Sequence, residues 1–286
     1  MRWFAAIGLM MLAACGRGDR SAPEHVSTPS PYGAVARDRI RSIENYVVYY
    51  GTGRFEELAR FDLAIIDRGT LTPGEVVDLR SRGTLVVAYL SVGEIQPNDP
   101  RVTSGEVPES WILGTNENWG SLFVDASQPG WRELMTDEAG SLLDYGFDGV
   151  FLDTVDTAID VAPDTTPGMI ELIEGLRATY PNALLVQNRG FEIAEQVASD
   201  IDAVMFEDLS TGYDFDAAEY TRVDNSAEAD AMVALRDRTG LPILALDYAD
   251  PADHQTAARA VRIAQDYGFI PAVSVIQLDE IPDYGI

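Results

Sequence analysis

The chain has 286 residues, of which 46% are hydrophobic and 23% charged, a composition typical of a folded protein with a sizeable core. All 20 basic residues are arginine and 47 residues are acidic, so the formal net charge is −27. This composition argues against lysine-dependent Schiff-base, pyridoxal-phosphate and Walker-loop chemistry, against His-rich zinc sites and Ser-His-Asp triads (two histidines), against intrachain disulfides (one cysteine), and against nucleic acid as a partner.

The N-terminus has the features of a secretory signal. Arg2 precedes an apolar run, residues 3–12, that is too short to span a bilayer as a mature helix. The run ends in Leu12-Ala13-Ala14-Cys15, which resembles the lipobox of bacterial lipoproteins, whose cysteine becomes a lipidated N-terminus after cleavage. We therefore expect a signal peptide over residues 1–14, lipidation at Cys15, and a lipid-anchored protein of the bacterial cell envelope or exterior. An ordinary signal peptide cut near Ala14 is the alternative.

We expect residues 15–40 to contain the lipidated cysteine and a flexible linker. The stretch 16–33 contains serine, threonine and proline and has no periodic apolar positions. His25 lies in this stretch and is expected to be solvated. Neither it nor His254, which falls in a predicted helix, is expected to be catalytic.

Eight short apolar runs alternate with amphipathic helical stretches in the rest of the chain. The runs cover residues 46–50, 63–67, 85–90, 149–153, 183–187, 203–207, 243–247 and 270–275. Most are too continuously apolar for half-exposed antiparallel strands, so they favour a parallel sheet covered by helices.

Local signals mark the ends of several helices. Thr72-Pro73-Gly74-Glu75 has a capping residue, a proline at the first helical position and a capping-box glutamate, and Asp250-Pro251-Ala252-Asp253 is expected to start another helix similarly. The string Asp-Tyr-Gly-Phe occurs at 144–147 and 266–269, where its glycine is expected to end a helix in a left-handed conformation.

Eight strand–helix units over residues 41–286 match the size of a single-domain α/β fold, the (β/α)₈ TIM barrel. An open doubly wound sheet is the alternative, disfavoured because no glycine-rich phosphate turn follows the first strand. The longest segment between strands, residues 91–147, is expected to form an elaborated loop with one extra short strand.

Acidic or amide side chains follow six of the eight predicted strands, at the barrel end where such folds carry their active sites. They are Asp67, Glu94, Asp153, Asn188, Glu207 and Asp247. Each alone is most simply a helix cap or a salt-bridge partner, but a ring of carboxylates at one barrel mouth is costly unless it is used. Carboxylates without lysine or histidine point to glycoside hydrolysis, which needs one neutral and one ionised carboxyl group.

Four strings in this order resemble glycoside hydrolase family 114, the endo-α-1,4-polygalactosaminidase-like proteins. They are Tyr-Leu-Ser-Val-Gly-Glu at 89–94, Gly-Phe-Asp-Gly-Val-Phe-Leu-Asp-Thr-Val-Asp at 146–156, Val-Gln-Asn at 186–188 and Phe-Glu-Asp at 206–208. The resemblance covers about residues 44–280. It implies a TIM barrel that cleaves galactosamine-containing exopolysaccharide internally, with a retaining mechanism and no cofactor.

The resemblance also implies roles for particular residues. The family's catalytic aspartate falls on Asp153, expected to be the nucleophile, and its catalytic glutamate on Glu207, expected to be the acid/base. The side chains expected to bind the substrate are Asp67, Glu94, Asn188, Asp247, Tyr49 and Tyr248. Thr154 and Asp208 replace the residues that better-studied members have after the two catalytic carboxylates, which places this chain among the bacterial relatives.

Two other functions remain open at this point. One is a non-catalytic lipoprotein that keeps the barrel to bind polysaccharide, and the other is a divalent-metal enzyme with Glu94, Asp153, Glu207 and Asp247 as oxygen ligands. The glycosidase hypothesis expects no metal, a monomer, and a membrane contact only through the lipid anchor. A deacetylated galactosamine polymer is cationic and would be attracted to an acidic cleft, although most of the charge lies on predicted helix faces.

Overall fold

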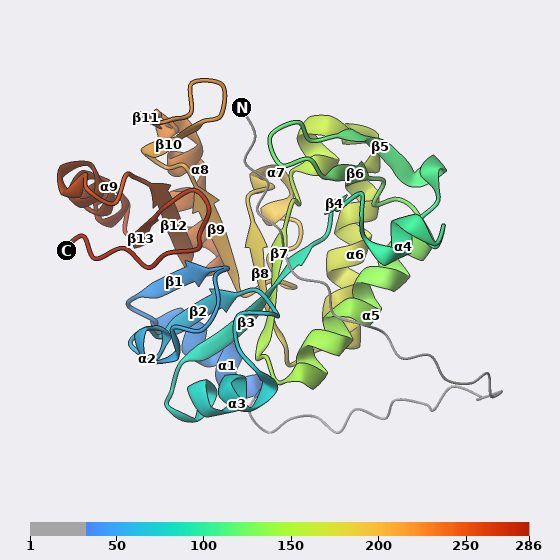
Figure 1. The fold of residues 1–286 in the computed structure, drawn as a ribbon, viewed down its shortest axis with the longest axis horizontal. Helices are drawn as coiled ribbons and strands as arrows, with labels where there is room; N and C mark the ends of the chain where they lie inside the picture. The colour runs from blue at the N-terminus through green and yellow to red at the C-terminus, as the bar shows by residue number, and fades with distance from the viewer. Residues whose placement is uncertain (1–32, 286) are drawn as a thin grey trace.

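Eight parallel strands form one sheet in the computed structural model, which describes residues 33–285 (Figure 1). Their order is β1-β2-β3-β7-β8-β9-β12-β13, and β1 also lies beside β13, so the sheet curls into a barrel. The strands are β1 (Tyr46–Tyr49), β2 (Leu63–Ile66), β3 (Leu85–Ser91), β7 (Gly149–Asp153), β8 (Leu184–Asn188), β9 (Ala203–Glu207), β12 (Ile243–Tyr248) and β13 (Ile270–Ser274). Each lies within two residues of a predicted run, and the predicted TIM barrel is confirmed.

Helices connect the strands and cover the outside of the barrel (Figure 1). They are α2 (Phe55–Leu58), α3 (Pro73–Ser81), α5 (Pro129–Tyr145), α6 (Thr166–Thr179), α7 (Phe191–Ala194), α8 (Ser226–Thr239) and α9 (His254–Asp266). The capping box of α3 is present, since Thr72 accepts from the Glu75 amide and Glu75 accepts from the Thr72 amide. No helix among residues 33–285 is long and apolar enough to cross a membrane.

The start of α9 differs from the prediction. Asp250 does not cap the helix, because its side chain accepts from the Ala252 amide in a turn of its own (2.8 Å). Asp253 caps α9 instead, accepting from the Thr256 amide at 2.9 Å. The sequence offered two aspartates of equal capping ability three residues apart, and the turn at the first moves the helix start to the second.

Side chains alternate along each strand between the barrel interior and the helix-covered outside. In β9, Ala203 and Met205 belong to the interior cluster, whereas Val204 and Phe206 pack in the cluster under the helices. Continuing this alternation by one residue turns Glu207 toward the interior at the carboxyl end of the barrel. The same rule decides which strand-end residues can reach a shared site.

The amino end of the barrel is covered by a segment that the sequence assigned to the linker. Helix α1 (Gly33–Arg39) and a 3₁₀ turn (Ile40–Ser42) lead into β1, and Ile40 is fully buried in the interior cluster. Arg37 pairs with the buried Asp202 at 2.7 Å, just before β9. The linker boundary at residue 40 is therefore wrong, and the fold extends to at least residue 33. The predicted signal peptide, Cys15 and His25 lie outside the described residues.

Two insertions rise from the carboxyl end of the barrel. After β3 the chain forms a three-stranded antiparallel sheet with the order β4-β6-β5, in place of the single extra strand predicted. After β9 it forms a hairpin that was not predicted. The elements of the insertions are β4 (Glu94–Ile95), α4 (Pro100–Thr103), a 3₁₀ turn (Glu109–Trp111), β5 (Ile112–Thr115) and β6 (Leu122–Val124), then β10 (Thr211–Asp214) and β11 (Glu219–Arg222). A π-helical turn (Thr157–Val161) and a 3₁₀ turn (Pro163–Thr165) follow β7.

Close packing of β7 on β8 explains a glycine of the family-like string. A Cβ atom added at Gly149 would lie 2.0 Å from the Leu184 carbonyl oxygen, inside the parallel ladder. We expect Gly149→Ala to lower the free energy of unfolding by at least about 2 kcal/mol, because backbone must shift to admit the methyl group. Gly175→Ala is the matched control: nothing lies within 4 Å of its Cβ position in α6, and alanine there should stabilise by up to about 1 kcal/mol. Urea unfolding of both variants measures this, and equal stabilities would contradict it.

Candidate active site

Asp153 is held from both sides at the end of β7. The Tyr89 hydroxyl donates to its Oδ2 at 2.8 Å, and the Asn188 Nδ2 donates to its Oδ1 at 2.6 Å. Tyr89 lies on β3 and Asn188 ends β8, the strands on either side of β7 in the sheet. Two neutral donors from neighbouring strands thus fix the orientation of this carboxyl group.

Glu207 ends β9 and faces a different environment. Its Oε1 accepts from the Tyr248 hydroxyl at 2.9 Å. Burial, followed by the nearby negative charge of Asp153, raises the pKa of Glu207 to about 8, against weaker opposing contributions from Arg189 and the Tyr248 hydrogen bond. The neutral acid therefore predominates at pH 7. A carboxyl group that keeps its proton at neutral pH can act as a general acid.

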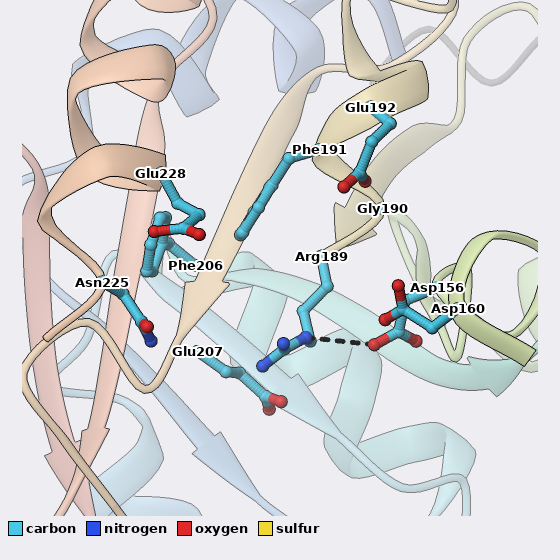
Figure 2. A pocket seen from close by; sticks show the side chains of 10 residues that line it. All are labelled: Asp156, Asp160, Arg189, Gly190, Phe191, Glu192, Phe206, Glu207, Asn225 and Glu228. Atoms are coloured by element: carbon cyan, nitrogen blue, oxygen red, sulfur yellow. Dashed lines mark ion pairs between the residues drawn. The ribbon is translucent and has the colours of Figure 1, made fainter. Parts of the chain in front are cut away.

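A pocket opens beside Glu207 between the loops that follow β7, β8 and β9. Besides Glu207 it is lined by Asp156, Asp160, Arg189, Gly190, Phe191, Glu192, Phe206, Asn225 and Glu228. Figure 2 shows the Arg189 guanidinium lying between Glu207 and the aspartates of the β7 loop. Arg189 pairs with Asp156 at 3.0 Å and with Asp208 at 3.7 Å, and burial raises the pKa of both aspartates to about 6 despite this charge.

The residue after each of these three strand ends has a left-handed backbone. The φ angles of Thr154, Arg189 and Asp208 are +63°, +52° and +58°, a conformation that costs non-glycine residues about 1–3 kcal/mol. At Thr154 the hydroxyl accepts from the Gly93 amide at 2.8 Å and lies 3.0 Å from the Ser91 hydroxyl. These turns direct the chain sharply away from the barrel mouth directly after Asp153, Asn188 and Glu207, whose side chains project into the site.

The structure places three of the predicted substrate-binding residues, Asp67, Asn188 and Tyr248, at inward-facing positions at the barrel mouth. Asn188 and Tyr248 contact the two carboxylates as described, and Asp67 is exposed at the end of β2. The buried Oδ1 of Asn188 has no hydrogen-bond partner among the described residues. Glu94 lies beyond the end of β3, on β4 of the first insertion, where it accepts hydrogen bonds from Asn116 and Ser121.

Two predicted binding residues point away from the site, and these assignments are corrected. Tyr49 packs in the outer cluster under the helices and donates to the Thr52 carbonyl oxygen at 3.1 Å. Asp247 is 1% exposed, and its Oδ1 accepts from the Ser210 and Thr211 amides, both at 2.7 Å. Both residues occupy outward positions of their strands, so neither can reach a sugar in the barrel mouth.

Two residues of the site, Tyr50 and Arg189, were not predicted to belong to it. Tyr50, one position beyond Tyr49, packs with the interior cluster and meets the Tyr89 ring edge-to-face at 5.0 Å. Tyr89 contacts Asp153, and Arg189 supplies the cation of the pocket. The alternation of inward and outward residues would have identified Tyr50 in place of Tyr49. Arg189 could have been noticed because it directly follows Asn188, a predicted strand-end residue.

The four oxygen ligands of the metal hypothesis are not brought together. Glu94 and Asp247 are engaged in the separate contacts given above, and no group of three or more His, Cys, Asp or Glu side chains within residues 33–285 is arranged to hold a metal ion. The geometry leaves Asp153 and Glu207 as the carboxylate pair of the site.

Comparison with known proteins shows the family of the chain. Residues 43–284 match the model of glycoside-hydrolase family GH114. The chain belongs to this family. The glycoside hydrolase domain of PelA from Pseudomonas aeruginosa is 27% identical, with a TM-score of 0.76 over 84% of this chain and 98% of that one. Ega3 of Aspergillus fumigatus, solved in complex with galactosamine, is 18% identical and shares the fold, with a TM-score of 0.66 over 82% of this chain and 91% of that one.

A bacterial relative of similar length extends the likeness along the chain. An uncharacterised protein of Deinococcus radiodurans is 25% identical over 302 aligned residues, which cover 96% of both chains. Membership of GH114 makes this protein a glycosidase by class. Its two carboxyl groups, one with a raised pKa and one held by hydrogen bonds, are what that class of reaction requires.

The pH dependence of this GH114 protein should follow Glu207. If Glu207 acts as the acid, kcat/KM falls as pH rises through about 8, the pKa at which the free enzyme loses that proton. Tyr248→Phe removes a hydrogen bond that favours the ionised form, so the alkaline limb should move to higher pH. Rate–pH profiles of wild type and variant measure the shift. An alkaline limb that moves to lower pH or stays fixed in Tyr248→Phe would contradict the assignment of Glu207 as the acid.

Proposed function

We propose that the protein is an endo-acting, retaining glycosidase that cleaves α-1,4-linked galactosamine polymers, with Asp153 as nucleophile and Glu207 as acid/base. The observation that carries the proposal is the contrast between the two carboxyl groups. Glu207 is half-buried and keeps its proton at neutral pH, whereas both oxygens of Asp153 accept hydrogen bonds from neutral donors.

In the first step Glu207 gives its proton to the glycosidic oxygen while an Asp153 oxygen attacks the anomeric carbon. The bond to the leaving sugar breaks, and a covalent glycosyl–Asp153 ester remains. In the second step Glu207, now ionised, takes a proton from water, and the water oxygen displaces Asp153 from the anomeric carbon. The exposed Asp67 is placed to accept hydrogen bonds from the bound sugar.

A cationic substrate fits the acidic pocket beside Glu207. Asp160, Glu192 and Glu228 line it and make no salt bridge to any arginine of the described segment. Carboxylates in a recess attract ammonium groups and hold them by charge-assisted hydrogen bonds. The galactosamine bound by Ega3, a protein of the same fold, carries such a group.

The location of the enzyme is proposed from its leader. Cleavage before Cys15 and lipidation of that cysteine would tether the barrel to the cell envelope, where an exopolysaccharide is accessible. We expect the tethered protein to act as a monomer, because the proposed site is built from residues of one chain.

The test is incubation of the wild type with deacetylated α-1,4-galactosamine polymer, followed by counting of reducing ends and sizing of the products. We expect internal cleavage to release oligosaccharides, and an uncharged α-1,4-glucan to remain intact as the matched control. Binding of the polymer without new reducing ends would overturn the proposal and favour a polysaccharide-binding lipoprotein.

A further inference from the structure

The two insertions at the carboxyl end of the barrel touch each other through aromatic side chains. Trp119, in the turn between β5 and β6, meets Phe215, at the tip of the β10–β11 hairpin, with ring centroids 5.1 Å apart and planes at 74°. Phe215 in turn meets Tyr213 edge-to-face at 5.2 Å. The insertions leave β3 and β9, and the strands between them in the sheet are β7 and β8, which carry Asp153 and Asn188. The contact thus joins two sides of the active-site mouth.

Each side of this contact is fixed by a strand-end carboxylate. Glu94 accepts from Asn116 at 3.1 Å and also from the Ser121 hydroxyl, which are the two ends of the turn that carries Trp119. The turn is closed by a hydrogen bond from the Asn116 amide to the Ser121 carbonyl oxygen at 2.8 Å. Glu94 therefore sets the position of Trp119.

The opposite side is fixed at the base of the hairpin. Asp247 accepts from the amides of Ser210 and Thr211, where the chain leaves the barrel for β10. At the hairpin tip, the Asp214 side chain accepts from the amides of Asp216 and Ala217, both at 2.9 Å. Phe215 is thus carried on a hairpin constrained at both ends.

The chemistry of this contact suits a cationic sugar. Trp119 is 49% exposed, although burying an indole ring would be favourable. An edge-to-face pair leaves a ring face free, and such faces bind both the apolar side of a pyranose and an ammonium group. Exposed carboxylates lie close to both rings in the sequence, namely Glu117 near Trp119, and Asp214 and Asp216 next to Phe215.

We infer that Trp119 and Phe215 form an aromatic platform that binds an amino-sugar unit of the polymer outside the catalytic subsite, and that Glu94 is the positioning residue that holds Trp119 in it. The inference rests on the proposed function for the identity of the polymer. It gives Glu94 a role different from the direct substrate contact expected from sequence.

Kinetics on two substrates test the platform. Trp119→Ala and Phe215→Ala are each expected to raise KM for the galactosamine polymer about tenfold, the usual worth of one stacking aromatic, while kcat changes much less. KM for a one-ring aryl galactosaminide, which cannot reach the platform, should change far less than KM for the polymer. Val77→Ala, which shortens an exposed apolar side chain on α3, is the control and should match wild type. Polymer KM values within twofold of wild type, or equal losses on both substrates, would overturn the inference.

The role of Glu94 is tested by its dependence on Trp119. Glu94→Gln should raise the polymer KM in the wild-type background and have no further effect in the Trp119→Ala background, because it acts through that ring. Additive effects of the two substitutions would show that Glu94 contacts the substrate by itself.

A binding measurement separates this inference from the proposed activity. The emission of wild type minus that of Trp119→Phe isolates the contribution of Trp119 from that of the other three tryptophans. We expect this difference spectrum to shift on titration with galactosamine oligosaccharide and not with a neutral α-1,4-glucan oligosaccharide. A shift without hydrolysis would retain the platform and reject the enzyme, whereas hydrolysis without a shift would reject the platform alone.

Discussion

Replacing Glu207 by glutamine is expected to lower kcat/KM on galactosamine polymer by at least about 10³-fold, because the variant has no proton to give to the leaving sugar. Tyr248 can still hydrogen-bond the amide oxygen, so the geometry at the end of β9 should persist. Rates of reducing-end formation for wild type and Glu207→Gln measure the effect. Glu133→Gln, an exposed position on α5, is the matched control and should retain full activity.

Substrates with different leaving groups show whether Glu207 acts as the acid/base. Dinitrophenolate leaves without being protonated, so the first step on a dinitrophenyl glycoside should survive in Glu207→Ala. Added azide should speed release of the sugar from the glycosyl enzyme and give a glycosyl azide of retained configuration. If Glu207→Ala is inactive on the activated glycoside as well as on the polymer, Glu207 is instead the nucleophile or has a structural role.

Stability provides a fold control for the same residue. The pKa of Glu207 is raised from about 4.5 to about 8 in the folded protein, so the wild type loses stability as pH rises between these two values, where the unfolded chain has released the proton and the folded protein still holds it. Glutamine has no such proton. The glutamine variant should therefore unfold at a temperature that is less sensitive to pH between about 5 and 8 than that of the wild type.

Replacing Asp153 by asparagine is expected to reduce turnover by about 10⁴-fold or more on every substrate, because no covalent intermediate can form. Unlike the Glu207 variants, this variant should be inactive on activated aryl glycosides too. The polymer should still bind, since the platform and the acidic pocket are intact. Asp78→Asn on the exposed face of α3 is the control. Wild-type rates on the dinitrophenyl glycoside would contradict the assignment of Asp153 as nucleophile.

The sequence predicted the barrel because its signals are local and repeat eight times. Continuous apolar runs identify buried parallel strands, and the polar residue that ends each run marks the carboxyl end. The errors at Tyr49 and Asp247 came from ignoring alternation. Asp247 and Tyr248 are adjacent on one strand, so only one of them can point into the barrel. Asp247 packs outward and Tyr248 inward.

Other features of the site depend on contacts that sequence spacing does not encode. Arg189 meets Asp156 from a different loop, and Glu94 meets Ser121, 27 residues away. The left-handed residues Thr154 and Asp208 carry side chains that give no strong sign of that conformation. Tertiary contacts impose these arrangements, so only the folded chain reveals them. The raised pKa of Glu207 similarly depends on burial and on the nearby charge of Asp153, which only the folded chain brings together.

The most direct test is to trap the intermediate and locate it. A 5-fluoro galactosaminyl fluoride should form a slowly hydrolysed ester on the nucleophile. Because the chain has no lysine, trypsin cuts only after arginine and places Asp153 in peptide 133–177 and Glu207 in peptide 190–222. We predict that mass spectrometry finds the added sugar on 133–177, at Asp153. A label on 190–222, or turnover of the fluoride with no labelled peptide, would contradict the retaining mechanism with Asp153 as its nucleophile.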